Sequence, residues 1–515
     1  MVQPKATRRD WIGLGVIALP CLLYSMDLTV LNLAVPRLSA DLQPTSAQLL
    51  WIIDIYGFLV AGSLITMGTL GDRIGRRRLL MIGAAAFGAA SVVAAFSTSA
   101  EMLIATRALL GIAGATLAPS TLSLIRNMFL DPHQRTVAIG VWVTSYSVGG
   151  AIGPLIGGVM LQYFWWGSVF LIGVPVMLLL LIVGPVLLPE FRDPKAGRLD
   201  LTSAALSLAA VLSVIYGLKR VAEGGAGLWA PVTILAGLAL GAAFVKRQRR
   251  LANPLIDLRL FRIPAFSASL SLYLLATLVA FGAYIFIAQY LQLVLDLSPL
   301  QAGLATVPSM LAFVAGSMLV PWIARRVPPA TTMAGGLVLA AVGFAMLTQM
   351  SGTSGLPVLI AGTVIYSLGI SPVVILATDL IVGSAPVEGA GAASAISETS
   401  SELGGALGIA ILGSIGVAVY RAAMADGVPE GVPPDVAETA KATLGGALAV
   451  AKQLPHDLGA ELLGTARGAF VRAFALTAAL SAAVALLMAP VAAIMLRRNH
   501  RISNGVVELT THREE

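Results

Sequence analysis

The chain has 515 residues, of which 57% are hydrophobic and only 11% are charged, and its formal net charge is +7. A soluble globular protein has about 25% charged residues, so this composition excludes that class and indicates that lipid surrounds most of the chain. The basic residues lie in loops between long apolar runs, which is the pattern of membrane topology and not of nucleic-acid binding.

The apolar runs are continuous and do not alternate, which favours membrane-spanning helices over a β-barrel. A spanning helix needs about 20 apolar residues. The first run is too long for a signal peptide and carries Asp27, so we expect it to be a retained helix. In chain order we predict fourteen membrane-spanning helices, at residues 11–36, 48–70, 78–97, 101–125, 134–160, 168–188, 200–219, 229–247, 265–293, 299–322, 331–350, 355–381, 391–419 and 468–496.

Lysine and arginine are concentrated in alternate loops, for example around 73–78 and 246–262, and again after 496. This asymmetry predicts a multi-pass protein of the bacterial inner (cytoplasmic) membrane with both termini in the cytoplasm. The last outer loop, 420–467, is acidic and has apolar residues at helical spacing. We therefore expect an extracellular helical hairpin at about 425–466, and a disordered loop is the alternative.

An internal repeat divides the chain. TSYSVGGAIGPLIGG at 144–158 and TSSELGGALGIAILG at 399–413 share a Thr, a Ser, a Gly-Gly pair and the next Gly. Transporters are commonly built from two such halves, with the substrate site between them. The repeat predicts an N-terminal six-helix bundle at 1–190, an inserted helix pair at 191–260 and a C-terminal six-helix bundle at 261–515.

The first half of the chain carries three motifs: GTLGDRIGRRRLL (68–80), RALLGIAGA (107–115) and a glycine series on the predicted fifth helix. Together they resemble the major facilitator superfamily. Fourteen helices and DLTVLNLAVP (27–36) resemble its drug:proton antiporter branch, the exporters of quaternary ammonium compounds, ethidium and puromycin. A generic glycine packing face is the alternative for the fifth-helix series taken alone. The motif residues, which the resemblance implies control conformation, are Gly68, Asp72, Arg73, Gly75, Arg76, Gly140, Gly149, Gly153, Pro154 and Gly158.

The resemblance covers essentially the whole chain and implies the major facilitator fold. One departure concerns the tenth helix, where some pumps of that branch carry a further acid. Here it reads SMLAFVAGSMLVPW, without an acid. This argues against transport of bulky divalent cations.

Ionisable residues within the predicted spans mark candidate proton sites, because such residues usually line transport pathways. Asp27 lies near the middle of the first helix, Asp54 lies near the outer end of the second, and Arg107 lies on the fourth. We expect both acids to take up and release protons, with Arg107 as a partner. A structural ion pair or a water-exposed helix end is the alternative. The predicted helix of Asp54 carries no basic residue, so a permanent charge there would be poorly compensated unless water or the neighbourhood of Asp27 reached it.

Glu398 and Glu402 lie one turn apart on the thirteenth helix and share a face. We expect this pair to attract a cation; if that helix begins later, Glu398 lies among lipid headgroups instead. Aromatic rings would complete a site for flat cations. The candidates are Tyr24, Tyr56, Trp142, Tyr146, Tyr284 and Phe313.

No phosphate-binding loop, catalytic triad or metal-ligand cluster is visible, and all four histidines lie outside the apolar runs. We therefore expect no enzyme activity, no metal and no cofactor, and a proton gradient as the energy source. The expected partners are the lipid bilayer, small lipophilic cations and protons, with the protein a monomer. The leading hypothesis is a proton-coupled multidrug exporter of lipophilic cationic drugs, antiseptics and dyes. The alternative is a transporter of the same fold for an endogenous solute such as an amino acid or a lipid.

Overall fold

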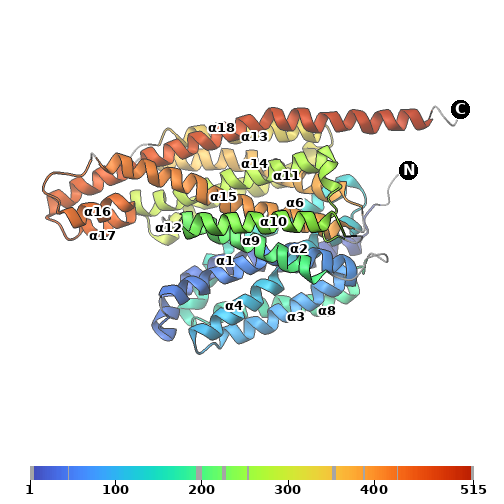
Figure 1. The fold of residues 1–515 in the computed structure, drawn as a ribbon, viewed down its shortest axis with the longest axis horizontal. Coiled ribbons are helices and arrows are strands. Elements are labelled where there is room, and N and C mark those ends of the chain that lie inside the picture. The colour runs from blue at the N-terminus through green and yellow to red at the C-terminus, as the bar shows by residue number, and fades with distance from the viewer. Residues whose placement is uncertain are drawn as a thin grey trace.

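The computed structural model describes residues 5–44, 46–192, 200–222, 228–251, 254–350, 355–386, 389–425 and 427–511. Every regular element within these residues is a helix, and the long helices run roughly along one axis (Figure 1). Within the described residues, 13 segments are long and apolar enough to cross a membrane. The 32-residue α6 (Pro132–Tyr163) is not among them, but at 1.5 Å per residue it is also long enough to span. The predicted all-α membrane fold is confirmed.

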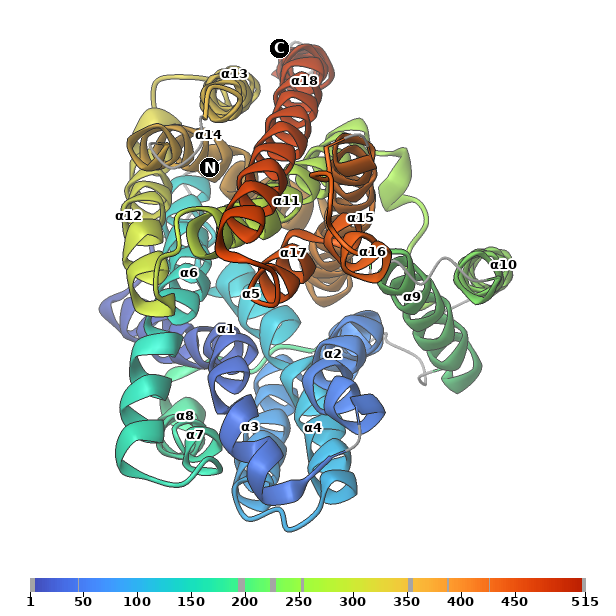
Figure 2. The same cartoon turned by 90° about the vertical axis from the view of Figure 1, so that its left-hand side faces the viewer.

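Most of the N-terminal bundle lies in the lower half of the view along the helices in Figure 2, with α6 reaching up beside α12 (Pro299–Ile323). Within it α1 packs along α6, α2 along α4, and α3 against α4 and α8. Its helices are α1 (Arg8–Leu42), α2 (Ser46–Ile74), α3 (Arg76–Ala95), α4 (Ala100–Gly114), α5 (Leu117–Met128), α6, α7 (Ser168–Leu171) and α8 (Gly173–Leu187).

The C-terminal bundle occupies the upper half of the same view. Here α13 packs against α14 and α18, and α11 packs along α15. Its elements are the 3₁₀-helix η1 (Leu260–Arg262), α11 (Pro264–Gln289), the π-helical turn η2 (Tyr290–Val294), α12 (Pro299–Ile323), α13 (Pro329–Leu347), α14 (Leu356–Ser384), α15 (Ala390–Ala425) and α18 (His456–Thr511).

Between the bundles in sequence lies a helix pair, α9 (Leu201–Ala222) and α10 (Trp229–Gln248). α10 packs on α9, and α9 in turn packs on both α2 and α15. The pair therefore lies over one seam between the two bundles (Figure 2).

The fourth and sixth predicted spans each contain one helix break, although each still forms one candidate membrane span, Ala100–Met128 and Ser168–Leu187, close to the predicted bounds. The fourth is broken between α4 and α5, and the sixth between α7 and α8. Proline cannot donate to the carbonyl four residues earlier, and its ring collides with that carbonyl. Pro119 lies four residues after Ala115, in the break between α4 and α5, and Pro175 lies four residues after Leu171, the last residue of α7.

Both chain ends lie at the same end of the molecule, and the alternating helices bring the loops after α2, α5, α8, α10, α12 and α14 to it (Figure 1). We call this the basic end; it is the end that the charge asymmetry predicts to be cytoplasmic. The opposite end carries α16 (Pro434–Ala442) and α17 (Leu444–Ala451), within the segment predicted as a hairpin. The Tyr420 hydroxyl donates a 2.9 Å hydrogen bond to the Ala440 carbonyl and so fastens α16 to α15. α18 begins at His456, well before the predicted residue 468, because the second half of the hairpin is continuous with the last span.

Candidate functional site

A cluster of aromatic rings from the N-terminal bundle meets two glutamates of α15 at the interface between the bundles. The Tyr24 hydroxyl of α1 donates a 3.2 Å hydrogen bond to Glu402 Oε1. The Tyr24 ring lies 5.6 Å from that of Tyr146, which in turn lies 4.8 Å from Trp142. A hydrogen-bonding hydroxyl, a carboxylate and aromatic faces are the groups that a lipophilic cation needs.

Glu398 lies one turn before Glu402 on the same helix. α15 begins at Ala390, so Glu398 lies inside the helix and half-buried, and the alternative of a later helix start is excluded. Its Oε1 atom is buried and has no hydrogen-bond partner among the described residues. An unpartnered buried carboxylate oxygen is costly, and a bound cation would remove that cost.

Arg107 of α4 and Asp27 of α1 form an ion pair inside the N-terminal bundle. Arg107 Nη1 lies 2.6 Å from Asp27 Oδ2, and their side chains are 1% and 16% exposed. The guanidinium also donates to the Ile52 carbonyl at 3.2 Å and lies over the Tyr56 ring, 4.7 Å from its centroid. Removing one partner of such a buried pair leaves an uncompensated charge, which typically costs about 3–5 kcal/mol.

Tyr56 connects this ion pair to the aromatic cluster. The Arg107 guanidinium lies over its ring, and the centroid of that ring lies 6.1 Å from the centroid of the Tyr24 ring. A continuous series of contacts therefore runs from Asp27 through Arg107, Tyr56 and Tyr24 to Glu402, from one bundle to the other.

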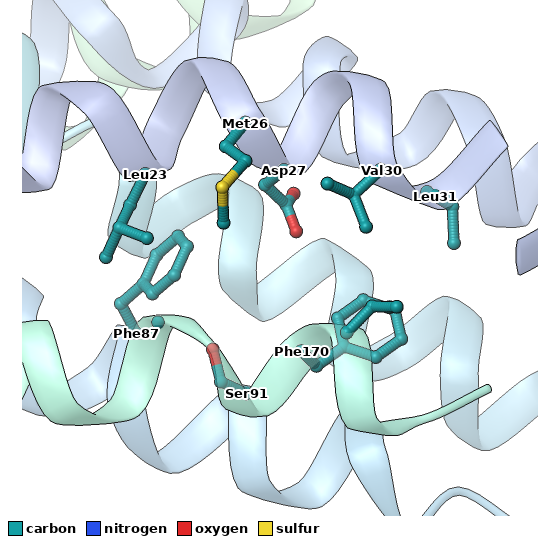
Figure 3. Close-up of a pocket in the computed structure, with 10 residues that line it drawn as sticks. Leu23, Met26, Asp27, Val30, Leu31, Phe87, Ser91 and Phe170 are labelled. Atoms are coloured by element: carbon teal, nitrogen blue, oxygen red, sulfur yellow. The ribbon is translucent and has the colours of Figure 1, made fainter. Parts of the chain in front are cut away.

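Asp27 also borders a small pocket, shown in Figure 3. The cavity volume is about 20 Å³, enough for one water molecule. The carboxylate of Asp27 and the hydroxyl of Ser91 provide polar groups in an otherwise apolar lining. The lining residues are Leu23, Met26, Asp27, Val30, Leu31, Phe87, Ser91, Val169, Phe170 and Gly173.

Asp54 has a partner that its own helix does not supply. Lys219 of α9 forms an ion pair with the Asp54 carboxylate, and its ammonium lies 5.5 Å from the centroid of the Phe58 ring. The expectation of a poorly compensated charge at Asp54 is therefore wrong, because a lysine from the inserted pair lies against it. The contact fastens α9 to α2.

Asp72 connects the bundles at the basic end. Its carboxylate accepts 3.0 Å hydrogen bonds from the backbone N–H groups of Gly391 and Ala392, at the start of α15, and lies 2.8 Å from Arg76. A carboxylate at a helix N-terminus is favoured by the free N–H groups and the helix dipole. A Cβ atom at Gly68 would lie 2.5 Å from the Gly391 carbonyl oxygen, so the close approach of α2 to α15 requires glycine there.

The rest of the same motif shapes the turn into α3. Gly75 has φ +112°, a conformation that favours glycine. The Arg76 guanidinium lies 5.0 Å from the centroid of the Phe191 ring. Nη1 of Arg73 is buried without a hydrogen-bond partner among the described residues. The backbone N–H groups of the two residues after Arg76 donate to Glu190, which fixes the end of α8 against the turn.

Two further polar contacts join the bundles at the basic end. Arg135 of α6 lies 2.6 Å from Asp379 of α14, which also accepts from the Thr136 hydroxyl at 2.8 Å. Arg325, just after α12, donates to His133 at 2.6 Å. Asp379, near the end of α14, is thus an inter-bundle partner. These contacts close the basic end.

The fifth-helix glycines differ in their surroundings. A Cβ at Gly149 would lie 2.1 Å from the Leu22 carbonyl oxygen, so this glycine permits the close packing of α6 on α1. A Cβ at Gly158 would meet nothing within 4 Å. Gly153 is buried, and the side chain of Pro154 lies outside the described set.

Two of the predicted aromatic residues make no ring contact with the cluster among the described residues. Tyr284 on α11 is 51% exposed, and Phe313 on α12 packs on the apolar core. Sequence reasoning did not single out Thr121, whose hydroxyl accepts a 2.9 Å hydrogen bond from the Trp142 indole. It also missed two ion pairs, Lys219 with Asp54 and Arg135 with Asp379, because the two partners of each pair are far apart in sequence.

Two helical bundles, a polar and aromatic cluster between them, and charged contacts closing one end define a membrane transporter. The chain belongs to the Major Facilitator Superfamily, whose family model matches residues 17–409.

Several curated relatives are similar over most of the chain. The multidrug efflux pump LfrA of Mycolicibacterium smegmatis is 44% identical over 81% of this chain and 84% of its own. The methyl viologen resistance protein SmvA of Salmonella typhimurium is 38% identical over 79% of this chain and 82% of its own. The puromycin resistance protein pur8 of Streptomyces alboniger is 32% identical over 81% of this chain and 84% of its own.

A solved structure, that of the human organic anion transporter MFSD10, has a TM-score of 0.62 and covers 95% of this chain and 100% of its own. At 17% identity this similarity concerns the fold alone.

Proposed function

We propose that the protein is a proton-coupled antiporter that exports lipophilic cationic drugs, antiseptics and dyes. The observation that carries the proposal is the meeting of Glu398 and Glu402 with the aromatic rings of the N-terminal bundle. Relatives named as a multidrug efflux pump, a methyl viologen resistance protein and a puromycin resistance protein support the same substrate class.

The cation would bind between the bundles. The unpartnered Oε1 of Glu398 offers a negative charge, and Tyr24 and Tyr146 offer aromatic faces close by. Such contacts recognise charge and flatness without fixing one shape, which suits a broad drug range. Tyr56 and Trp142 stay candidate aromatic residues, and Tyr284 and Phe313 would act only if the substrate extends toward the C-terminal bundle.

The proton would act first at Asp27. Protonation removes the carboxylate charge, so the pair with Arg107 is lost and the guanidinium needs a new partner. Arg107 contacts Tyr56, and Tyr56 is adjacent to Tyr24, so its displacement disturbs the bond between Tyr24 and Glu402. In this way proton uptake weakens the drug site, which is the coupling that antiport requires. Asp54 remains a candidate proton site of secondary importance, because Lys219 compensates its charge.

The basic end would face the cytoplasm of a bacterial cell, with the protein in the inner (cytoplasmic) membrane and both termini inside. Opening toward the cytoplasm then requires that Asp72 leave α15 and that Arg135 leave Asp379. The protein would act as a monomer, without enzyme activity, cofactor or metal.

Ethidium efflux from cells that overexpress the protein tests the proposal. Efflux faster than in control cells, and abolished by a protonophore, is the expected result. Efflux equal to that of control cells, together with uptake or release of an amino acid or lipid, would favour the endogenous-solute alternative instead. Export that continues after the proton gradient has collapsed would exclude proton coupling.

A further inference from the structure

A positively charged pocket lies at the basic end, where the last turn of α10 meets the loop that leads to α11. Its cavity volume is about 500 Å³. Three arginines and three apolar side chains form its walls: Arg249, Arg259 and Arg262, with Val245, Leu258 and Phe261. We call it the arginine pocket. None of its residues belongs to the transport site described above.

The pocket carries uncompensated positive charge. Arg259 pairs with Asp257 at 2.9 Å, whereas the guanidinium groups of Arg249 and Arg262 have no hydrogen-bond or ion-pair partner within the part of the chain that the structure describes. The hydrogen bonds from Arg259 lower the pKa of Asp257, so this acid is ionised at neutral pH. Three guanidinium groups and one carboxylate leave two net positive charges beside exposed apolar surface.

Hydrogen bonds hold the walls of the pocket in place. Gln248, at the end of α10, donates to Ser203 at 2.8 Å and accepts from the Leu255 backbone N–H at 2.7 Å. The Ser267 hydroxyl donates to the Phe261 carbonyl at 2.7 Å. The loop is therefore fastened to both α9 and α11.

An exposed apolar strip leads from the pocket along α10. Leu235, Leu238 and Val245 are all exposed, and their spacing of three and seven residues places them on one helix face. From Leu235 to Val245 the helix rises about 15 Å, half of the roughly 30 Å hydrocarbon core. Among helices of the described residues, α10 packs mainly on α9, so this face is left to lipid.

We propose that the arginine pocket binds the phosphate of an anionic glycerophospholipid from the membrane leaflet at the basic end. One acyl chain of this lipid would lie along the apolar strip of α10. Guanidinium groups bind phosphate oxygens through paired hydrogen bonds, and basic pockets at the cytoplasmic side of spanning helices hold acidic headgroups. The continuity of the charged pocket with a leaflet-deep apolar strip favours a lipid over a soluble phosphate. The bound lipid would hold the α9–α10 pair at a fixed depth beside the seam that α9 covers.

Lipid titration of the purified protein in neutral detergent, followed by native mass spectrometry, tests this proposal. The probes are phosphatidylglycerol, phosphatidylcholine with the same chains, and inorganic phosphate. We expect the parent to bind phosphatidylglycerol in preference to phosphatidylcholine. The variant Arg249→Gln/Arg262→Gln should lose about tenfold or more in that affinity, because it lacks two charged hydrogen-bond donors. Arg250→Gln is the matched control, since it removes the same charge from the same loop but does not line the pocket.

Equal binding of the two lipids would overturn the proposal by showing that the parent does not select the anionic headgroup. Equal losses of phosphatidylglycerol affinity in the double variant and in Arg250→Gln would also overturn it, by showing that only diffuse charge attracts lipid. Inorganic phosphate that displaces phosphatidylglycerol at similar concentration would indicate a soluble-anion site and also overturn it. If the double variant does not fold, Arg262→Gln alone gives the same test: weaker phosphatidylglycerol binding supports the pocket, and unchanged binding contradicts it.

Discussion

The Tyr24 hydroxyl on α1 donates a 3.2 Å hydrogen bond to Glu402 on α15, so this bond joins the two bundles at a distance from the contacts of the basic end. The bond ends a series of contacts that begins at the pair between Asp27 and Arg107. Relative movement of the bundles must stretch or break it. The proposed drug site and the proposed proton site are therefore parts of one connected structure, although they belong to different helices.

We predict that Glu398→Gln and Glu402→Gln weaken the export of cations more than that of neutral drugs. Loss of a charged contact costs about 1.5–3 kcal/mol, so the apparent affinity for ethidium should fall roughly tenfold to a hundredfold. Efflux assays with ethidium and a neutral substrate measure the difference. Methyl viologen, a dication, is a useful third probe, because the tenth helix has no acid to supply further charge.

Tyr24→Phe is the control for this experiment. It removes the hydroxyl that bonds Glu402 but keeps both carboxylates and the aromatic face. We expect a smaller loss of ethidium affinity than in either glutamine variant. Equal losses for charged and neutral drugs in the glutamine variants would assign the pair to folding or coupling instead.

Residue patterns within single helices predicted much of this arrangement. Glu398 and Glu402 share a face because of their one-turn spacing, and Arg107 was expected near Asp27 because an isolated charge in a span needs a partner. Contacts between distant segments could not be predicted. Lys219 lies 165 residues after Asp54, and its approach depends on how α9 packs on α2, which no local pattern encodes. The same reason hid the pairing of Arg135 with Asp379.

The ion pair between Asp54 and Lys219 makes a second prediction. Asp54→Asn and Lys219→Met should each destabilise the protein by about 1–3 kcal/mol, because each leaves one partly buried partner unsatisfied. The double variant should lose less stability than the two single variants lose together. Thermal unfolding of the parent, the two single variants and the double variant measures this coupling. Strict additivity would show that the contact does not stabilise α9 on α2. We also expect Asp54→Asn to slow transport less than Asp27→Asn does.

Closure of the basic end makes a third prediction, which concerns Gly68→Val. The added side chain would collide with the Gly391 carbonyl and Ala395. We expect the basic end to stay open, so that a cysteine introduced at Ser397 in a Cys21→Ser background reacts faster with an impermeant maleimide added from that side. Gly158→Val is the matched control, because a Cβ there meets nothing within 4 Å. Similar labelling rates in both variants would mean that the contact between α2 and α15 does not control access.

The fourth prediction concerns the proton itself. Asp27→Asn keeps the size of the side chain but removes both its charge and its proton, so Arg107 loses its ionic partner permanently. We expect the variant to insert in the membrane and to bind drug more weakly than the parent, but not to transport it against a gradient. Arg107 would then hold the displaced position that protonation normally produces.

Proton release measures this directly. Ethidium added to the purified parent in a weakly buffered solution should release protons, because the bound cation favours the ionised acids, and Asp27→Asn should release fewer. Asp54→Asn is the matched control: it makes the same chemical change in a carboxylate whose charge Lys219 already compensates, and it should release nearly as many protons as the parent. If Asp27→Asn releases as many protons as the parent, Asp27 is not the carrier. The exchanged proton would then belong to Glu398 or Glu402, where drug and proton would compete for the same carboxylate.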